Sequence, residues 1–188
     1  QTAVYGDTLN LSNTSTFSGF VDGDLAGTSG LGGTAVFAVS GEMPTNGLRD
    51  AGKYNLTYQS GLSSDLGYTF ADATAQVDEL TITPKALTVT LQAAMGNPLT
   101  KVYDGTENIA LGSGNFALSG FVGQQGVGAT LGGVTSGTFN SKNVLQATTV
   151  SADLSKATVS ATGEGFKATN YSLPTTAVVT AAGTITPK

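Results

Sequence analysis

The chain of 188 residues contains no cysteine, no histidine and no tryptophan, and only 11% of its residues are charged. Without cysteine and histidine, the protein cannot form disulfide bonds, thiolate nucleophiles, imidazole acid–base pairs or the common zinc sites. Long apolar runs are also missing, since no stretch approaches the roughly 20 residues of a membrane-spanning helix. We therefore expect a non-enzymatic protein with no catalytic residues, no metal, no cofactor and no insertion into a membrane.

Glycine and threonine dominate what is present. The 26 glycines are about twice the usual share of roughly 7%, and threonine is the commonest residue. Both are poor helix formers, while a hydrophobic content of 39% is sufficient for a core. The composition predicts an all-β protein with many turns.

Charge is spread unevenly along the chain, whose net charge is −5. Residues 1–85 carry nine acidic and three basic side chains, whereas residues 86–188 carry four acidic side chains and five lysines. Neither half has the basic surface that nucleic-acid binding requires, so we expect no nucleic-acid partner. The difference between the halves predicts two units.

Short motifs recur in the same order in the two halves. The segment Thr-Ile-Thr-Pro-Lys stands at 81–85 and again at 184–188. Three further motifs recur at offsets of 98 to 103 residues: Tyr5 and Tyr103, Ser-Gly-Phe-Val at 18–21 and 119–122, and Tyr68 and Tyr171. A nearly constant offset is typical of related modules that differ by loop insertions. We predict two tandem modules, 1–85 and 86–188.

Alternation of apolar and polar residues predicts the strands. It is most regular at 53–59, where Tyr54, Leu56 and Tyr58 share one face, so at least two of the three are expected to be buried. Further strands are predicted at 34–40, 80–83, 87–92, 115–122, 148–151, 157–161 and 177–184. Glycine turns are predicted at 22–23, 32–33, 46–47, 104–105 and 132–133. The one helical expectation is a short turn at 72–80. Short strands at this spacing predict antiparallel sheets, as an immunoglobulin-like sandwich or a mostly-β, β-grasp-like fold.

The joint between the modules is short. One predicted strand ends at Thr83 and the next begins near Ala86, which leaves Pro84 and Lys85 between them. Proline fixes its own φ and favours an extended residue before it, so the joint is expected to be stiff. We expect a monomer with its modules arranged end to end. The closing Thr-Ile-Thr-Pro-Lys predicts a further module in the parent protein, because such repeats form arrays.

Ordered motifs link each half to known repeat domains. The second half carries Lys-Val-Tyr-Asp-Gly-Thr at 101–106 and Leu-Ser-Gly-Phe-Val at 118–122, and in these motifs it resembles the YDG repeat domain of large bacterial exoproteins. The first half carries Val-Tyr-Gly-Asp at 4–7 and Asp-Ala-Gly-Lys-Tyr at 50–54, and it resembles the companion MBG domain. At 141–144 the second half departs from the first and reads Ser-Lys-Asn-Val.

The resemblance also has functional implications. Such domains occur in tandem in filamentous-haemagglutinin-type, two-partner-secreted adhesins and in related surface or biofilm proteins. It therefore implies a secreted or cell-surface bacterial protein, with a role in the stalk or the adhesive part. It supplies no catalytic residues.

Two acidic motifs could bind a ligand. Asp22-Gly23-Asp24 offers oxygen ligands to Ca²⁺, but a calcium loop needs more acidic or amide positions, and the second copy reads Gly123-Gln124-Gln125. Tyr103-Asp104-Gly105, like Tyr5-Gly6-Asp7, could place an aromatic ring and a carboxylate against a sugar. We expect a turn in the first case and a core tyrosine that anchors a turn in the second.

Other reactive side chains follow weaker patterns. No glycosidase pair is indicated, because the glutamates lie in dissimilar contexts: Glu42, Glu79, Glu107 and Glu164. No partner residue is singled out for an isopeptide bond at Lys53 or Lys101. Glycosylation acceptor patterns, which matter only in a cell that has the transferase, begin at Asn13, Asn55 and Asn170.

The leading hypothesis is a non-enzymatic stalk or spacer of a bacterial surface or biofilm adhesin, whose partners are neighbouring repeat domains of the same chain. The alternative is a carbohydrate-binding module that contacts exopolysaccharide or host glycan. Burial of most Phe and Tyr side chains would favour the spacer, and an exposed cluster of them would favour the binding module. A glycan-processing enzyme would need two carboxylates about 5 to 10 Å apart in a cleft.

Overall fold

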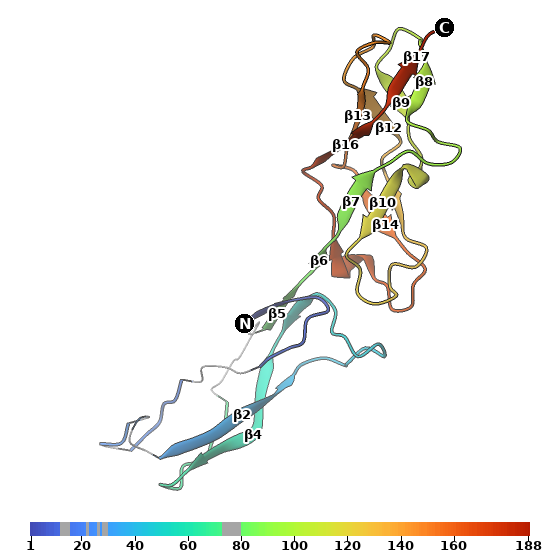
Figure 1. Ribbon diagram of the computed structural model, residues 1–188. Helices are drawn as coiled ribbons and strands as arrows, with labels where there is room; N and C mark the ends of the chain where they lie inside the picture. Colours follow the sequence, from blue (N-terminus) through green and yellow to red (C-terminus); the bar gives the residue numbers. More distant parts are fainter. Residues whose placement is uncertain (12–15, 22, 26, 28–29, 73–79) are drawn as a thin grey trace. The chain divides into compact units, whose positions relative to one another are not determined.

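The computed structural model describes the whole chain except residues 12–15, 22, 26, 28–29 and 73–79 (Figure 1). The described residues form seventeen strands, two short 3-10 turns and no α-helix, as the composition predicted. They divide into two compact units, Gln1–Thr83 (unit 1) and Pro84–Lys188 (unit 2). The division lies two residues before the expected boundary, because Lys85–Ala86 (β6) pairs with Tyr171–Ser172 (β15) inside unit 2.

Unit 1 contains a three-stranded sheet and a two-stranded ribbon. The sheet has the order β1-β5-β3 and is formed by Thr2–Val4 (β1), Leu80–Thr83 (β5) and Gly52–Tyr54 (β3). Strand β1 is parallel to β5, and β3 is antiparallel to it. The ribbon pairs Leu31–Val39 (β2) with Leu56–Ser64 (β4) in antiparallel fashion.

Unit 2 contains one four-stranded sheet and four strand pairs. The antiparallel sheet has the order β16-β13-β12-β9, formed by Val178–Ala182, Thr149–Asp153, Ser136–Phe139 and Asn108–Ala110. Two antiparallel pairs join Thr88–Leu91 (β7) to Phe116–Ser119 (β10), and Thr130–Gly132 (β11) to Thr158–Ser160 (β14). The parallel pairs are β6 with β15, and Thr100–Val102 (β8) with Thr184–Thr186 (β17).

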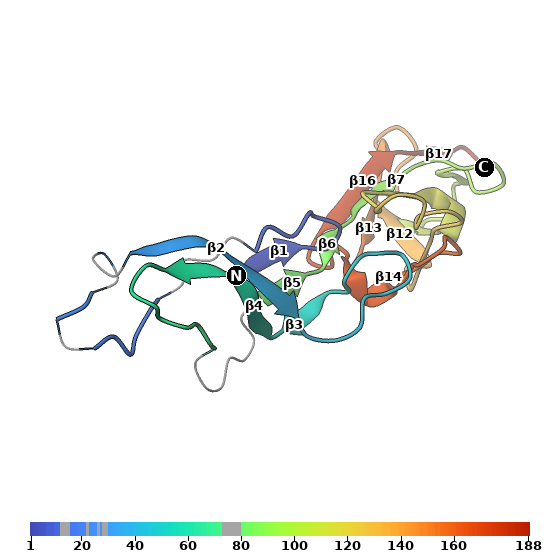
Figure 2. The same cartoon turned by 90° about the horizontal axis from the view of Figure 1, so that it is seen from below.

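The path of the chain through unit 2 runs from one end to the other. Strands β6 and β17, the first and the last of the unit, lie at its opposite ends (Figures 1 and 2). Between them, one cluster of apolar side chains forms the core, in which Phe139, Val150 and Leu154 are at most 1% exposed. The chain therefore enters unit 2 at one end and leaves it at the other.

The alternation at 53–59 correctly predicted which side chains are exposed, namely those at 53, 55, 57 and 59. Its prediction of the buried side chains is correct only in part. Leu56 is 2% exposed, but Tyr54 and Tyr58 are half-buried, so the expectation of two buried residues is wrong. Strands β2 and β4 form a ribbon of two strands, which cannot cover both of its faces. Tyr58 instead packs edge-on against Phe37 on β2, with ring centroids 6.3 Å apart.

The turn predicted at Gly32-Gly33 is also wrong, because both residues lie within β2. Gly33 has a φ of +85°, and a Cβ atom there would clash with the carbonyl oxygen of Gly61 on β4. The register of the ribbon shifts just after Gly33, so the glycine permits a bulge in place of a turn. The helical turn predicted at 72–80 falls largely outside the described residues, and at Leu80 the chain is already in β5.

Candidate functional site

A tyrosine contact is repeated in the two units. The hydroxyl of Tyr68 accepts a hydrogen bond from the backbone N–H of Val21 at 3.1 Å, and the hydroxyl of Tyr171 accepts one from Val122 at 3.1 Å. In each unit the tyrosine ring also meets, edge-on, the phenylalanine that precedes the valine, with centroids 5.3 and 5.1 Å apart. The motifs that recur in the sequence therefore make the same contact in both units.

Each tyrosine hydroxyl also donates a hydrogen bond, and here the units differ. Tyr68 donates to the Asp24 carboxylate at 2.5 Å, and this bond raises the pKa of Tyr68 above its ordinary value. Tyr171 donates to the side-chain oxygen of Gln125 at 2.6 Å. Tyr171 and Gln125 are 6% and 5% exposed, whereas Tyr68 and Asp24 are half-buried. The contact is therefore an interior one only in unit 2.

We expect Tyr171→Phe to lower the free energy of unfolding of unit 2 by about 1 to 3 kcal/mol, because buried Gln125 and half-buried Val122 each lose a hydrogen bond. Tyr68→Phe is the matched control, with a smaller expected loss in unit 1, since water can replace the hydroxyl at a half-buried site. Urea denaturation, followed by amide NMR signals assigned to each unit, measures both effects. Equal losses of unfolding free energy in the two variants would contradict the expectation that burial makes the Tyr171 hydrogen bonds more important for stability.

The Asp22-Gly23-Asp24 motif contributes to this contact through Asp24. Asp22 lies outside the described residues. The backbone N–H of Asp24 donates to the carbonyl oxygen of Val21 at 3.0 Å, which closes a turn as the sequence predicted. Among the residues that the structure describes, no three acidic side chains converge where they could hold a metal ion. Asp24, one of the two carboxylates considered for Ca²⁺, is hydrogen-bonded to Tyr68 and so already has a structural partner.

Removal of divalent cations is expected to leave the protein unchanged. One carboxylate that already accepts a tyrosine hydroxyl falls short of a calcium loop, so no binding free energy is lost when Ca²⁺ is removed. Thermal unfolding in EDTA should give the same midpoint as unfolding in calcium-containing buffer. A midpoint lower by more than a few degrees in EDTA would point to a site at Asp24.

The Tyr103-Asp104-Gly105 motif forms a turn that a lysine holds in place. Lys101 Nζ donates to Asp104 Oδ1 at 2.7 Å, to the Thr106 hydroxyl at 2.8 Å and to the carbonyl oxygen of Asn108 at 2.8 Å. The same Oδ1 accepts hydrogen bonds from the backbone N–H and the hydroxyl of Thr106, each at 2.9 Å. Asp104 and Lys101 thus join the two sides of the turn.

The turn keeps Asp104 ionised. Hydrogen bonds from Lys101 and from Thr106 lower the pKa of Asp104 to about 2, because all of them favour the carboxylate over the carboxylic acid. A carboxyl group with so low a pKa has no proton to give at neutral pH. It is also a poor partner for amide formation with Lys101. The Asp104 carboxylate therefore has a structural role: it accepts the hydrogen bonds that stabilise the turn.

The titration of Asp104 is expected to have its midpoint near pH 2, and Lys101→Met should move it upward toward the ordinary value of 3.8. Because the pKa is lowered on folding, the turn's contribution to stability is complete above about pH 4 and is lost as the pH falls toward 2. Carboxyl ¹³C NMR measures the midpoint. Lys156→Met, on an exposed lysine of the same unit, is the control and should leave it in place. A wild-type midpoint near 3.8 would contradict the proposed stabilisation of the Asp104 carboxylate by Lys101 and Thr106.

The two tyrosines that open these motifs share backbone contacts but differ in burial. The N–H of Tyr5 donates to the carbonyl oxygen of Thr83, and that of Tyr103 to Thr186, both at 2.8 Å. Tyr5 is fully buried, whereas Tyr103 is 39% exposed, so the expected core position is wrong for Tyr103. β1 lies in a sheet with a third strand, but β8 and β17 pair only with each other, which leaves more of Tyr103 uncovered.

Most of the other aromatic side chains are half-buried. Of the 14 Phe and Tyr residues, all of which the structure describes, four are buried, nine are half-buried and only Tyr103 is exposed. The tightest group, formed by Phe121, Phe166 and Tyr171, has ring centroids 5.1 to 6.3 Å apart. No exposed cluster of aromatic rings is therefore available to stack against a sugar.

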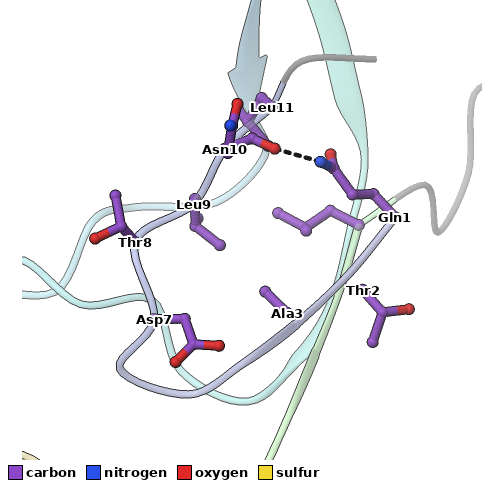
Figure 3. A pocket seen from close by; sticks show the side chains of 9 residues that line it. Gln1, Thr2, Ala3, Asp7, Thr8, Leu9, Asn10 and Leu11 are labelled. Carbon is purple, nitrogen blue, oxygen red and sulfur yellow. Dashed lines mark hydrogen bonds between the residues drawn. The ribbon is translucent and has the colours of Figure 1, made fainter. Parts of the chain in front are cut away.

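A pocket of about 180 Å³ lies beside β1 in unit 1 (Figure 3). Residues 1–3 and 7–11 and Leu80 line it, and the Gln1 side chain reaches across to donate to the carbonyl oxygen of Asn10. Asp7 is its one charged side chain, and no lining residue is aromatic. The pocket thus lacks the two carboxylates of a glycosidase.

The remaining reactive residues are dispersed or covered. Glu79 and Asn13 lie outside the described residues, and the other three glutamates, Glu42, Glu107 and Glu164, are exposed. Asn170 is fully buried in unit 2, so its acceptor pattern is covered in the folded protein, whereas Asn55 is exposed.

Sequence analysis did not single out Asn115, which is fully buried with three hydrogen bonds. A signal that could have found it is an asparagine directly before an aromatic residue. That pair recurs at Asn115-Phe116 and Asn170-Tyr171, and in both cases it ends a 3-10 turn and opens a strand.

Comparison with known proteins bears on unit 2. A family model described as YDG domain matches residues 83–178, about half of the chain. No curated protein and no solved structure matches the chain. The matched range includes the Tyr103-Asp104-Gly105 turn and the tyrosine contact of Tyr171.

Proposed function

Because the chain belongs to the YDG domain family, we propose that it is a non-enzymatic stalk or spacer segment of a bacterial surface or biofilm adhesin, which extends and presents an adhesive region. Unit 1 then serves as an MBG-like companion of the YDG unit. On this proposal the protein is exported, acts as a monomer and has neighbouring repeat domains as its partners.

The observation that carries the proposal is the path of the chain through unit 2. The unit begins with β6 at one end and finishes with β17 at the other (Figure 1). A unit with this path adds its own length to a tandem chain, whereas a unit with adjacent ends would fold the chain back. The parallel pairing of β17 with β8 ties the outgoing strand to the body of the unit along three residue pairs.

The chemistry of the side chains supports a mechanical role. The Asp104 carboxylate is held ionised in a turn, and Asp24 is bonded to Tyr68. Four of the 14 aromatic residues are buried, fewer than the majority expected for a spacer, but only Tyr103 is exposed, so the exposed cluster expected for a carbohydrate-binding module is not formed. With no cysteine or histidine, such a segment is also independent of redox conditions.

Small-angle X-ray scattering of the full chain tests the spacer. For a monomer whose units extend the chain, we expect a radius of gyration well above the roughly 16 Å of a compact globule of this length. A compact scattering profile would contradict the proposal. A glycan array is the complementary measurement: binding that is lost in Tyr103→Ala would favour the carbohydrate-binding module, and absence of binding is the expected result.

A further inference from the structure

The first strand of unit 2 makes two kinds of pairing. Its first part, β6, runs parallel to β15, with Lys85 opposite Tyr171, and its second part, β7, runs antiparallel to β10. Leu87, between the two parts, donates its N–H to the carbonyl oxygen of Ser172 at 2.8 Å and so continues the ladder. Leu87, Val89 and Leu91 are 4 to 6% exposed. The segment 85–91 therefore holds β10 and β15 by backbone bonds and by three buried side chains.

The internal repeat locates the counterparts of β10 and β15 in unit 1. The offset of 101 residues that relates Val122 to Val21 places residues 117–119 of β10 on residues 16–18. The offset of 103 that relates Tyr171 to Tyr68 places β15 on residues 68–69. Both offsets are supported by the hydrogen bond that each tyrosine hydroxyl accepts from its valine, at 3.1 Å in each unit.

In the part of unit 1 that the structure describes, these counterparts are not paired. Residues 16–20 and 68–71 belong to no strand, and among the described residues none makes a backbone–backbone hydrogen bond with these two segments. The burial differs accordingly: Tyr68 is half-buried where Tyr171 is buried, and Val21 is 64% exposed where Val122 is half-buried. Unit 1 thus has counterparts of both flanking segments of unit 2, and none of its described strands bridges them.

We propose that unit 1 binds an added β-strand with the sequence pattern of residues 85–91, that is, the first strand of a YDG-type unit. The strand runs antiparallel to residues 16–18 and parallel to residues 68–69, as its counterpart does in unit 2. Its backbone groups pair with those of residues 16–18 and 68–69, and its alternate Leu, Val and Leu side chains supply buried apolar surface. This proposal holds whether or not the chain is part of an adhesin.

Charge favours this occupant over a second, acidic copy of unit 1. Residues 1–83 carry nine acidic and two basic side chains, whereas the segment 85–91 carries a single charge, that of Lys85. Lys85 lies opposite Tyr171 in unit 2. At the corresponding place in unit 1, Tyr68 is bonded to the Asp24 carboxylate, where unit 2 has the neutral Gln125. A strand that begins with lysine would therefore bring a positive charge to the place where unit 1 has the Asp24 carboxylate.

The test is to join a second copy of residues 84–98 directly ahead of Gln1 in the full chain, which reproduces the offset of 98 residues between Tyr5 and Tyr103. We expect the amides of residues 16–18 and 69 to exchange with deuterium at least tenfold more slowly than in the unextended chain. The thermal midpoint of unit 1 should rise at the same time. Exchange rates of the amides in β13 of unit 2 monitor folding in every variant.

The matched control carries the same extension with serine at the three apolar positions of the added copy that correspond to Leu87, Val89 and Leu91. It should give no protection. Unchanged exchange in the extended chain, or equal protection in the control, would overturn the proposal. Protection in the unextended chain that disappears on dilution would identify a second copy as the occupant and would also overturn it. A synthetic peptide of residues 84–92, added to the unextended chain, should shift the same amide signals.

Discussion

Replacing Asn115 by Asp is expected to destabilise unit 2 by about 3 kcal/mol or more at pH 7, because it places a charge in a buried site and removes the N–H groups that donate two hydrogen bonds there. Asn115 is fully buried. Its Nδ2 donates to the carbonyl oxygens of Gln92 at 3.0 Å and Asn97 at 2.7 Å, and its Oδ1 accepts from the N–H of Gly112 at 2.9 Å. A carboxylate in this place would direct one oxygen at two carbonyl oxygens.

The loss in Asn115→Asp should depend on pH. Burial and the facing carbonyl oxygens raise the pKa of the new carboxyl group in the folded state above its unfolded value. The folded protein then binds the extra proton more tightly, so the penalty is complete at neutral pH and shrinks as the pH falls toward the unfolded pKa. Urea denaturation at pH 7 and pH 4.5 measures both values.

The control for this prediction is Asn108→Asp, which makes the same chemical change at an exposed position of β9 in the same unit. It should change the free energy of unfolding by no more than about 0.5 kcal/mol, as surface substitutions usually do. A loss in Asn115→Asp as small as that of the control, or one that does not respond to pH, would contradict the role given to the buried amide.

Leu154→Ala is expected to cost unit 2 about 2 to 5 kcal/mol, the range for removal of a buried leucine side chain. Leu154 is fully buried and belongs to the single apolar cluster of the unit. The substitution removes apolar contacts and leaves a cavity in the closely packed interior. The hydrogen bond from the backbone N–H of residue 154 to the carbonyl oxygen of Ala177, at 3.2 Å, does not involve the side chain. The loss of unfolding free energy therefore measures the contribution of side-chain packing.

Leu145→Ala is the matched control, because the same atoms are removed from a side chain that is 95% exposed. It should leave the urea midpoint of unit 2 within error of the wild type. Both variants can be followed by amide NMR signals of unit 2. A midpoint for Leu154→Ala that equals that of Leu145→Ala would show that the cluster is not the stabilising core of the unit.

Features that repeat or alternate over many residues could be predicted from the sequence. The recurring Ser-Gly-Phe-Val and tyrosine motifs pointed to the pairs that now form the same contact in both units. The long strand β4 shows regular alternation in the sequence, and its polar positions Thr57 and Gln59 are exposed as expected. Strands of three residues, such as β1 and β8, contain too few positions for a period to be recognised.

The parallel pairs could not be predicted for a different reason. β1 pairs with β5 across almost the whole length of unit 1, and β8 pairs with β17 across most of unit 2. No local pattern marks two segments that meet only when the intervening chain has folded. The interior position of Asn115 has the same origin, since its partners Gln92 and Asn97 come from another part of the chain.

The sequence by itself determined the all-β class, the internal repeat and the lack of thiol and imidazole chemistry, because composition and spacing are properties that a chain has before it folds. Only the tertiary structure decided which tyrosines are covered and which described segments of unit 1 lie outside its strands. Burial and pairing depend on what other strands bring to the same place. The β1–β5 pair is extended by a third strand, β3, which lies beside β5, whereas β8 and β17 pair only with each other. Tyr5 and Tyr103 therefore begin the same motif but end in different environments.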